Sequence, residues 1–172
     1  MKLNKLQKKI GISFKDDKLL IQALTHKSFD TKNNYEKLEF LGDRVLGFVI
    51  SKKLLELYPN EKVGMIDKKL ANLVNKNKCF EIGKELELDN YILTGNTEKK
   101  KKVNIEKKII SDCCESMIGA IYIDKGFEVS SKFILNYWKN YLNLSDTTVI
   151  DSKTRLQEYS LKKFKALPIY KL

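Results

Sequence analysis

The sequence predicts a mostly helical protein. Apolar residues recur at intervals of three and four in most segments of the 172-residue chain, which is the spacing of one helix face. The chain has only two prolines, so long disordered linkers are not expected. Its hydrophobic fraction of 42% is that of an ordinary soluble protein with a core. Only the segment 168–170, Pro-Ile-Tyr, reads as the beginning of a strand.

The helical segments are separated by recognisable stop signals. Gly11 ends the first, Pro59 ends the third and Gly126 closes the helix that precedes it. Residues 89–108 lose the pattern and contain a turn at 94–97 and four consecutive lysines at 99–102, which are either a solvated loop or a phosphate-gripping one. The expected helices span residues 4–10, 14–27, 35–58, 64–76, 77–86, 109–125, 127–142 and 151–163.

The charge of the chain favours a polyanionic partner. With 33 basic and 22 acidic residues the formal net charge is +11, which suits a nucleic acid or an anionic membrane surface. A lysine-rich proteome is the plainer explanation, because Arg44 and Arg155 are the only arginines. No segment has the roughly 20 apolar residues of a membrane helix, and the N-terminus lacks an apolar signal core. We therefore expect a cytoplasmic protein that does not enter membranes.

The histidine and cysteine content limits which catalytic and metal sites the chain can form. The single histidine, His26, excludes a ribonuclease that uses two histidines as acid and base. The cysteines Cys79, Cys113 and Cys114 have neither disulfide nor zinc-site spacing, so they are interpreted as small apolar filler. A redox switch formed by the adjacent pair is the alternative.

The segment 35–58 carries acids on one face of its expected helix. Glu36, Glu39 and Asp43 are three and four residues apart, and apolar residues continue the same face toward the C-terminus. Carboxylates in such surroundings are costly to bury unless a cation neutralises them. We expect Gly47, one turn beyond Asp43, to leave room for a metal shell or a second helix, and Gly42 to allow close helix packing.

The segment 109–125 repeats this design. Asp112 and Glu115 share a face, and Gly119 follows one turn later. Two carboxylate pairs supply the hard oxygen ligands that Mg²⁺ and Mn²⁺ prefer, and metal-activated water attacking a phosphodiester is the reaction that fits them in a basic protein. Solvated acid pairs are also common on helix surfaces.

The string NYEKLEFLGDRVL at 34–46 resembles the signature of the ribonuclease III family. ALTHKS at 23–28 and DCCESMIGAIYIDKG at 112–126 extend the resemblance over about residues 5–142. It implies an all-α ribonuclease III endonuclease domain at 1–143 that forms a symmetric homodimer on double-stranded RNA. Each subunit would cut one strand and leave a 5′-phosphate, a 3′-hydroxyl and a two-nucleotide 3′ overhang, in rRNA and mRNA processing.

The resemblance also implies roles for the acids. Glu39, Asp112 and Glu115 match the ligands of Mg²⁺, with Mn²⁺ able to substitute. Asp43 and Glu115 match the catalytic residues that position and activate the attacking water.

Other positions match supporting features of the family or depart from them. Glu36 matches an auxiliary acid, and Phe40 matches a phenylalanine that inserts into the partner subunit. Val63 stands where the family usually has an acid, with Glu61 offset by two, and Ser116 replaces a common alanine.

The C-terminal part is similar to the start of a double-stranded RNA-binding domain. Residues 144–150 are expected to be a linker, and 151–172 an incomplete α+β fragment of that domain. Lys153, Thr154 and Gln157 match RNA-contacting positions of its first helix, and such domains read RNA shape across two minor grooves.

Two other functions are weighed against a Mg²⁺-dependent endoribonuclease. A catalytically inactive RNA-binding or ribosome-associated protein of the same fold would not need its embedded carboxylates. A helical enzyme acting on prenyl diphosphates would need repeated Asp-rich motifs, which the sequence lacks.

Overall fold

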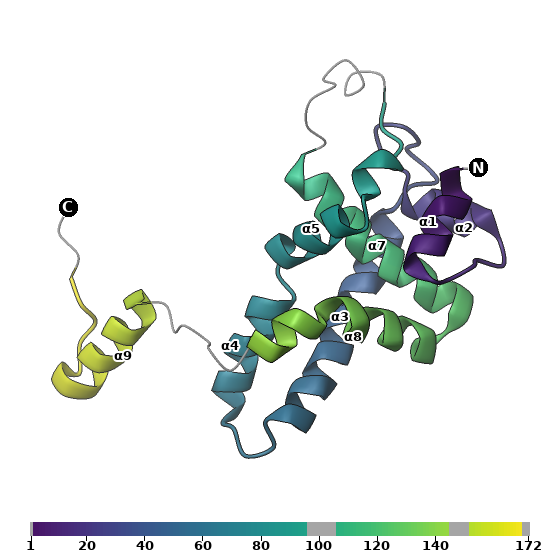
Figure 1. The fold of residues 1–172 in the computed structure, drawn as a ribbon. Coiled ribbons are helices and arrows are strands. Elements are labelled where there is room, and N and C mark those ends of the chain that lie inside the picture. The colour runs from purple at the N-terminus through teal and green to yellow at the C-terminus, as the bar shows by residue number, and fades with distance from the viewer. Residues whose placement is uncertain (1, 96–105, 145–151, 170–172) are drawn as a thin grey trace.

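The structure, a computed structural model, describes residues 2–95, 106–144 and 152–169, and within these it is mostly helical (Figure 1). The regular elements there are α1 (Lys2–Ile10), α2 (Asp17–Ala23), α3 (Glu36–Leu57), α4 (Val63–Leu73), α5 (Lys76–Glu85), the 3-10 helix η1 (Leu88–Asn90), α7 (Lys107–Lys125), α8 (Phe127–Leu144) and α9 (Ser152–Phe164).

Helix α7 forms the centre of the molecule. Every residue from Ile109 to Ile121 is buried, and the helix packs against α2, α3, α5 and α8 (Figure 1). Such all-round burial explains why its sequence is apolar on more than one face. Trp138 of α8 is fully buried, and its indole N–H donates to the carbonyl of Leu73 over 2.8 Å, which ties α8 to the end of α4. The acids of α7 therefore stand on a fixed element.

Two expected boundaries are wrong for identifiable reasons. The helix expected over 14–27 is shorter, because the Asp16 side chain caps the start of α2 and Thr25 pairs with Leu93 in an isolated parallel bridge beyond its end. The boundary expected between residues 76 and 77 lies earlier, because the Asn75 side chain accepts a backbone N–H of α5 and caps that helix. Helix α5 therefore begins at Lys76.

Glycines set the distance between α3 and α7. A Cβ on Gly42 would overlap the carbonyl oxygen of Glu115, and one on Gly119 would overlap the carbonyl oxygen of Leu38. The two backbones thus touch at this crossing, as expected for Gly42. At Gly47 a Cβ would meet nothing within 4 Å, so none of the described helices packs against this glycine, and its room for a metal shell stays a prediction.

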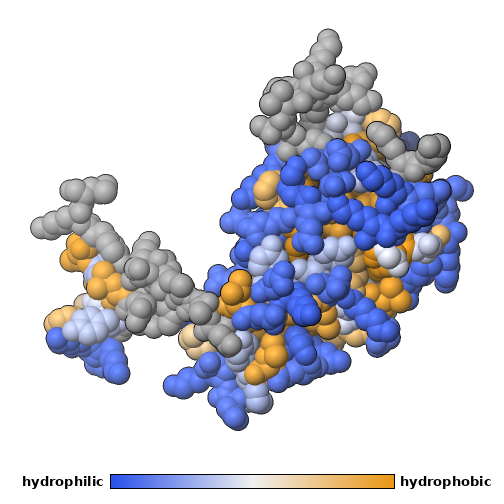
Figure 2. Space-filling view, in the orientation of Figure 1, coloured by the Kyte–Doolittle hydropathy of each residue, from blue (hydrophilic) through white to orange (hydrophobic). Residues whose placement is uncertain are grey.

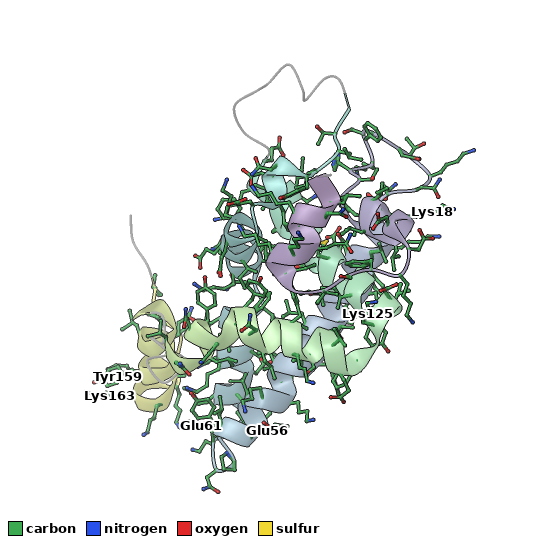
Figure 3. All side chains as sticks on the ribbon, turned by 45° about the vertical axis from the view of Figure 1, so that its right-hand side comes forward. Lys18, Glu56, Glu61, Lys125, Tyr159 and Lys163 are labelled. Atoms are coloured by element: carbon green, nitrogen blue, oxygen red, sulfur yellow. The ribbon has the colours of Figure 1, made fainter. Side chains whose placement is uncertain are left out.

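Helix α9 lies apart from the other helices in Figure 1, and apolar side chains gather on it in Figure 2. Leu156, Leu161 and Phe164 are exposed, and Figure 3 shows Tyr159 beside Lys163, whose ammonium donates to its hydroxyl over 2.9 Å. Residues 168–169, expected to begin a strand, have no regular structure, and position 170 lies outside the described residues, as does most of the expected linker. The assignment of 151–172 to an α+β domain stays a prediction.

The three cysteines are buried and free, in agreement with their interpretation as apolar filler. Among the described residues no helix combines the length and the apolar character needed to cross a bilayer.

Candidate active site

The acids of α3 and α7 meet where these helices cross. Glu39, Asp112 and Glu115 each offer a carboxylate oxygen, and the three oxygens lie within 4.8 Å of one another. The glycine contact described above allows this approach, because larger residues would separate the two backbones. Acids about seventy positions apart in the sequence therefore lie together in one cluster, which we call the acid cluster.

The members of the acid cluster differ in burial. The side chains of Asp112 and Glu115 are 5% and 3% exposed, whereas that of Glu39 is 26% exposed. Helix α7 thus supplies the enclosed oxygens and α3 the one that faces solvent. Buried carboxylates need a positive partner or hydrogen-bond donors.

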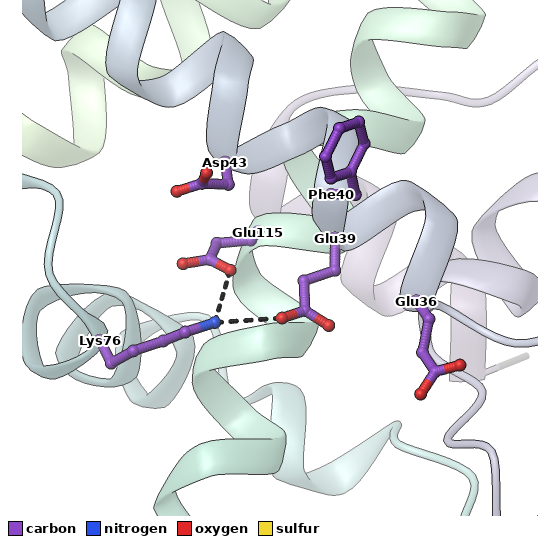
Figure 4. Close-up of a pocket in the computed structure, with 6 residues that line it drawn as sticks. All are labelled: Glu36, Glu39, Phe40, Asp43, Lys76 and Glu115. Atoms are coloured by element: carbon purple, nitrogen blue, oxygen red, sulfur yellow. Dashed lines mark hydrogen bonds and ion pairs between the residues drawn. The ribbon is translucent and has the colours of Figure 1, made fainter.

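Lys76 provides that partner. Its ammonium donates to Glu39 over 3.1 Å, to Asp112 over 2.6 Å and to Glu115 over 2.8 Å, and two of these contacts are drawn in Figure 4. Lys76 does not stand out in the sequence, because it has many lysine neighbours and the expected boundary puts it at the end of a helix rather than at the start of α5. The Asn75 cap is the one local signal that could have corrected its position.

Burial and the positive charge of Lys76 shift the pKa values of the cluster's carboxylates in opposite directions. Burial raises the pKa of Glu115 above its ordinary value, Lys76 lowers it, and the charges of Asp43 and Glu39 raise it further, with a raised pKa as the net result. The pKa of Glu39 is raised as well, mainly by burial. Burial lowers the pKa of Lys76, but its hydrogen bonds to the acids outweigh this and raise the pKa overall, so its ammonium stays charged.

A pocket of about 450 Å³ opens beside the acid cluster (Figure 4). Asp43 borders it one turn beyond Glu39, with its side chain 38% exposed and paired with the guanidinium of Arg44. Asp43 is not among the three converging ligand groups, although it faces the same pocket. The full lining is Glu36, Glu39, Phe40, Asp43, Lys76 and Glu115.

The remaining predicted positions of α3 lie at the edge of this pocket. Glu36 is exposed and pairs with Lys27 over 3.2 Å, so it is not a member of the acid cluster. Phe40 is 66% exposed, close to the 62% of Phe48 and Phe164, and the Arg44 guanidinium lies 5.2 Å from its ring centre.

A second pocket, of about 200 Å³, shares Glu36 and Glu39 with the first. Lys27 and Lys108 line it together with Asp112 and Glu106. Lysines near a carboxylate cluster are suited to hold phosphates of a polyanion beside it. Lys27 belongs to the string ALTHKS at 23–28, which carries the resemblance but gives this lysine no role, and nothing in the sequence distinguishes Lys108 from other lysines.

The remaining positions noted in the sequence lie outside the acid cluster. Val63 is 82% exposed at the start of α4, and no acid replaces it in the acid cluster. Ser116 is fully buried and its hydroxyl donates to backbone carbonyls, including that of Cys113 over 2.9 Å, so α7 accommodates it. Lys153, Thr154 and Gln157 fall within α9, and their proposed contacts with RNA stay predictions; the lysine run at 99–102 lies outside the described residues.

The donor set of the acid cluster fits a hard divalent cation. Three carboxylates from two helices offer oxygen atoms without nitrogen or sulfur, which is the ligand chemistry of Mg²⁺ and Mn²⁺. Their burial adds an electrostatic demand for positive charge, which the single ammonium of Lys76 meets only in part.

Comparisons with known proteins point to one family. A family model described as Ribonuclease-III-like matches residues 16–142. Ribonuclease 3 of Pelagibacter ubique (strain HTCC1062) is 61% identical over 100% of this chain and 78% of the relative. Ribonuclease 3 of Hahella chejuensis (strain KCTC 2396) is 42% identical over 99% of this chain and 76% of the relative.

Solved structures have the same fold. A structure of the nuclease domain of ribonuclease III from Campylobacter jejuni, concerned with flexibility in its dimer-forming region, is similar with a TM-score of 0.76 and 38% identity, covering 80% of this chain and 97% of that one. Dicer from Pichia stipitis, at 20% identity and a TM-score of 0.60 over 91% of this chain and 72% of that one, shares the fold.

Proposed function

Because this chain belongs to the ribonuclease III family of enzymes, we propose that it is a Mg²⁺-dependent endoribonuclease that cuts double-stranded RNA. One observation carries the proposal: Glu39, Asp112 and Glu115 converge within 4.8 Å at the crossing of α3 and α7. Membership of the family indicates the type of reaction, and the three converging carboxylates indicate where in this chain it would take place.

The acid cluster would hold the metal. Glu39, Asp112 and Glu115 are its ligands in this proposal, and a bound Mg²⁺ supplies a lowered water pKa and charge stabilisation at the scissile phosphate. Glu115 and Asp43 then orient a water molecule toward the phosphorus from the pocket that they share. Asp43 is suited to this task because it faces the pocket without joining the acid cluster.

The substrate assignment rests on charge as well as on family. A net charge of +11 is a strong attraction for RNA, and Lys27 and Lys108 line the pocket beside Asp112. The acid cluster itself repels phosphates, so the surrounding lysines and the metal must overcome that repulsion. Helix α9 and residues 151–172 would add contacts as the start of a double-stranded RNA-binding domain, following a nuclease domain at 1–143 and a linker at 144–150.

A homodimer completes the proposal. The exposed Phe40 would insert into the partner subunit, and two acid clusters would cut the two strands. The expected products have 5′-phosphates, 3′-hydroxyls and two-nucleotide 3′ overhangs. A cytoplasmic role in rRNA and mRNA processing follows from the same family pattern.

The test is cleavage of a long RNA duplex. Wild type is expected to cut it with Mg²⁺ and not with EDTA, and to leave single-stranded RNA of the same length uncut. Sequencing of both product ends checks the overhang. Glu115→Gln is expected to bind the duplex without cutting it.

The opposite result has a definite meaning. If wild type leaves the duplex intact with Mg²⁺ while it and Glu115→Gln bind it equally, the enzymatic proposal is wrong. The chain would then be a catalytically inactive RNA-binding protein of this fold.

A further inference from the structure

Lys76 occupies the centre of the acid cluster. Its ammonium lies 2.6 to 3.1 Å from one oxygen of each of the three proposed metal ligands. An ammonium has three N–H donors, so these contacts use all of them. In the ion pairs of the described residues, Lys76 is the positive group that contacts Asp112 and Glu115.

A divalent cation bound by the same oxygens could not coexist with this ammonium. Mg²⁺ bonds oxygen at about 2.0–2.1 Å, so the ion would lie against the nitrogen at the same centre. Two positive charges in contact at a partly dry site repel each other strongly. Binding of the metal by these oxygens therefore requires departure of the Lys76 side chain.

The position of Lys76 makes departure feasible. Its side chain is 51% exposed, although the two carboxylates that it contacts on α7 are almost fully buried. Lysine has a flexible four-carbon stem and a strongly hydrated ammonium, which can turn to solvent. It is also the first residue of α5, where the helix dipole disfavours a positive charge. The acids, and not α5, hold the ammonium in place.

We infer that Lys76 is an internal counter-cation that competes with the divalent metal for Glu39, Asp112 and Glu115, and so sets the metal concentration at which the site fills. This inference rests on the metal site of the proposed function. Without metal, the ammonium offsets part of the negative charge of the carboxylates and stabilises the crossing of α3 and α7. With metal, the same contact has to be given up, which weakens the apparent affinity.

The experiment compares Lys76→Met with Lys84→Met. Lys84 belongs to the same helix, is 48% exposed, and pairs with a single acid, Asp89, so its removal changes the net charge equally without touching the acid cluster. Mg²⁺ dissociation constants are measured by isothermal titration calorimetry on the full chain without RNA. Each variant is also made with Asp112→Asn, which identifies heat that comes from this site.

The expected result is tighter binding in one variant alone. Lys76→Met should bind Mg²⁺ roughly tenfold tighter or more, because charge-assisted hydrogen bonds that the metal had to break are gone. Lys84→Met should match wild type, and Lys76→Arg, which keeps the positive charge, should not bind more tightly than wild type. Asp112→Asn should weaken binding in every background.

Thermal unfolding gives a second readout. In EDTA, Lys76→Met should melt at a lower temperature than Lys84→Met, and saturating Mg²⁺ should close that gap. If Lys76→Met does not fold without metal, Lys76→Gln, which lacks the charge but retains hydrogen bonding, replaces it in both measurements.

Two outcomes overturn the inference, and they are distinguishable. Equal or weaker Mg²⁺ binding by Lys76→Met than by wild type overturns the competition alone and leaves the metal site intact. Absence of binding that depends on Asp112 in every variant overturns both the competition and the proposed metal site.

Discussion

Helices α3 and α7 carry similar acid pairs but present them differently. In α7 the residues from Ile109 to Ile121 are all buried, and its two site carboxylates are almost fully enclosed. In α3 the site acids Glu39 and Asp43 are 26% and 38% exposed, and Phe40 beside them is largely in solvent. One helix is a fixed internal element, and the other lies between the core and the outside.

The difference indicates a division of labour. Buried charges interact strongly with a cation because water screens them little, so α7 should dominate metal affinity. The exposed acids of α3 are better placed to meet water and substrate in the pocket. Substitutions in the two helices should therefore differ in their effects on activity.

The largest effect is expected from the α7 acids. Asp112→Asn and Glu115→Gln should each lower kcat/KM for duplex RNA by up to about 10³-fold, about 4 kcal/mol, as loss of one charge-stabilising group does. Glu39→Gln should lower it less, because its more exposed carboxylate contributes less to the field at the metal. Single-turnover cleavage at several Mg²⁺ concentrations measures the ranking. A larger loss for Glu39→Gln than for both α7 variants would contradict the division.

The next effect concerns the contact that joins the two helices. Gly42→Ala should lower the free energy of unfolding by about 2 to 3 kcal/mol, since its methyl group would overlap the α7 backbone. Gly47→Ala is the matched control on the same helix, with nothing near, and should raise stability by up to about 1 kcal/mol through helix propensity. Urea unfolding measures both. Equal stability of the two variants would show that the helices do not depend on this contact.

A smaller effect is expected at the solvent face of α3. Phe40→Ala should weaken the proposed dimer by about 1 to 2 kcal/mol, as truncation of a buried aromatic anchor does. Phe164→Ala, which removes a similarly exposed ring from α9, is the control. Sedimentation velocity over a dilution series measures the association. An unchanged sedimentation mass for Phe40→Ala at low concentration would count against its interface role.

The smallest effect is expected for Glu36. It is exposed and its ion pair with Lys27 is one of the kind that contributes little, so Glu36→Gln should change kcat/KM by no more than about fivefold. The same cleavage assay applies. A loss as large as that of Glu39→Gln would place Glu36 among the metal ligands instead of at the pocket edge.

The fold was predictable from the sequence where local patterns were long. Helices α3 and α7 lie within two residues of their expected bounds because their apolar periodicity is strong. Short elements were less predictable: α2 ends early because Thr25 pairs with Leu93, a contact distant in sequence. A Cβ on Gly47 would meet nothing, which only the tertiary structure reveals.

The candidate site was predictable as far as acids are concerned. Carboxylates repeated on one helix face are a visible pattern, and the family resemblance singles out Glu39, Asp112 and Glu115 among them. The structure brings these three together, and their role as metal ligands stays a prediction. Lys76 was not predictable, because its role depends on where α5 begins relative to α7. A lone lysine has no periodicity, and its partners lie 36 and more residues away.

We propose that α3 and α7 jointly hold a divalent metal. A crystal structure of wild type grown with Mn²⁺, with anomalous diffraction recorded at the manganese edge, would locate it. We expect an anomalous peak bonded to oxygens of Glu39, Asp112 and Glu115, with the Lys76 ammonium moved away from them. No peak at the acid cluster, with Lys76 still bonded to all three acids at saturating Mn²⁺, would contradict it.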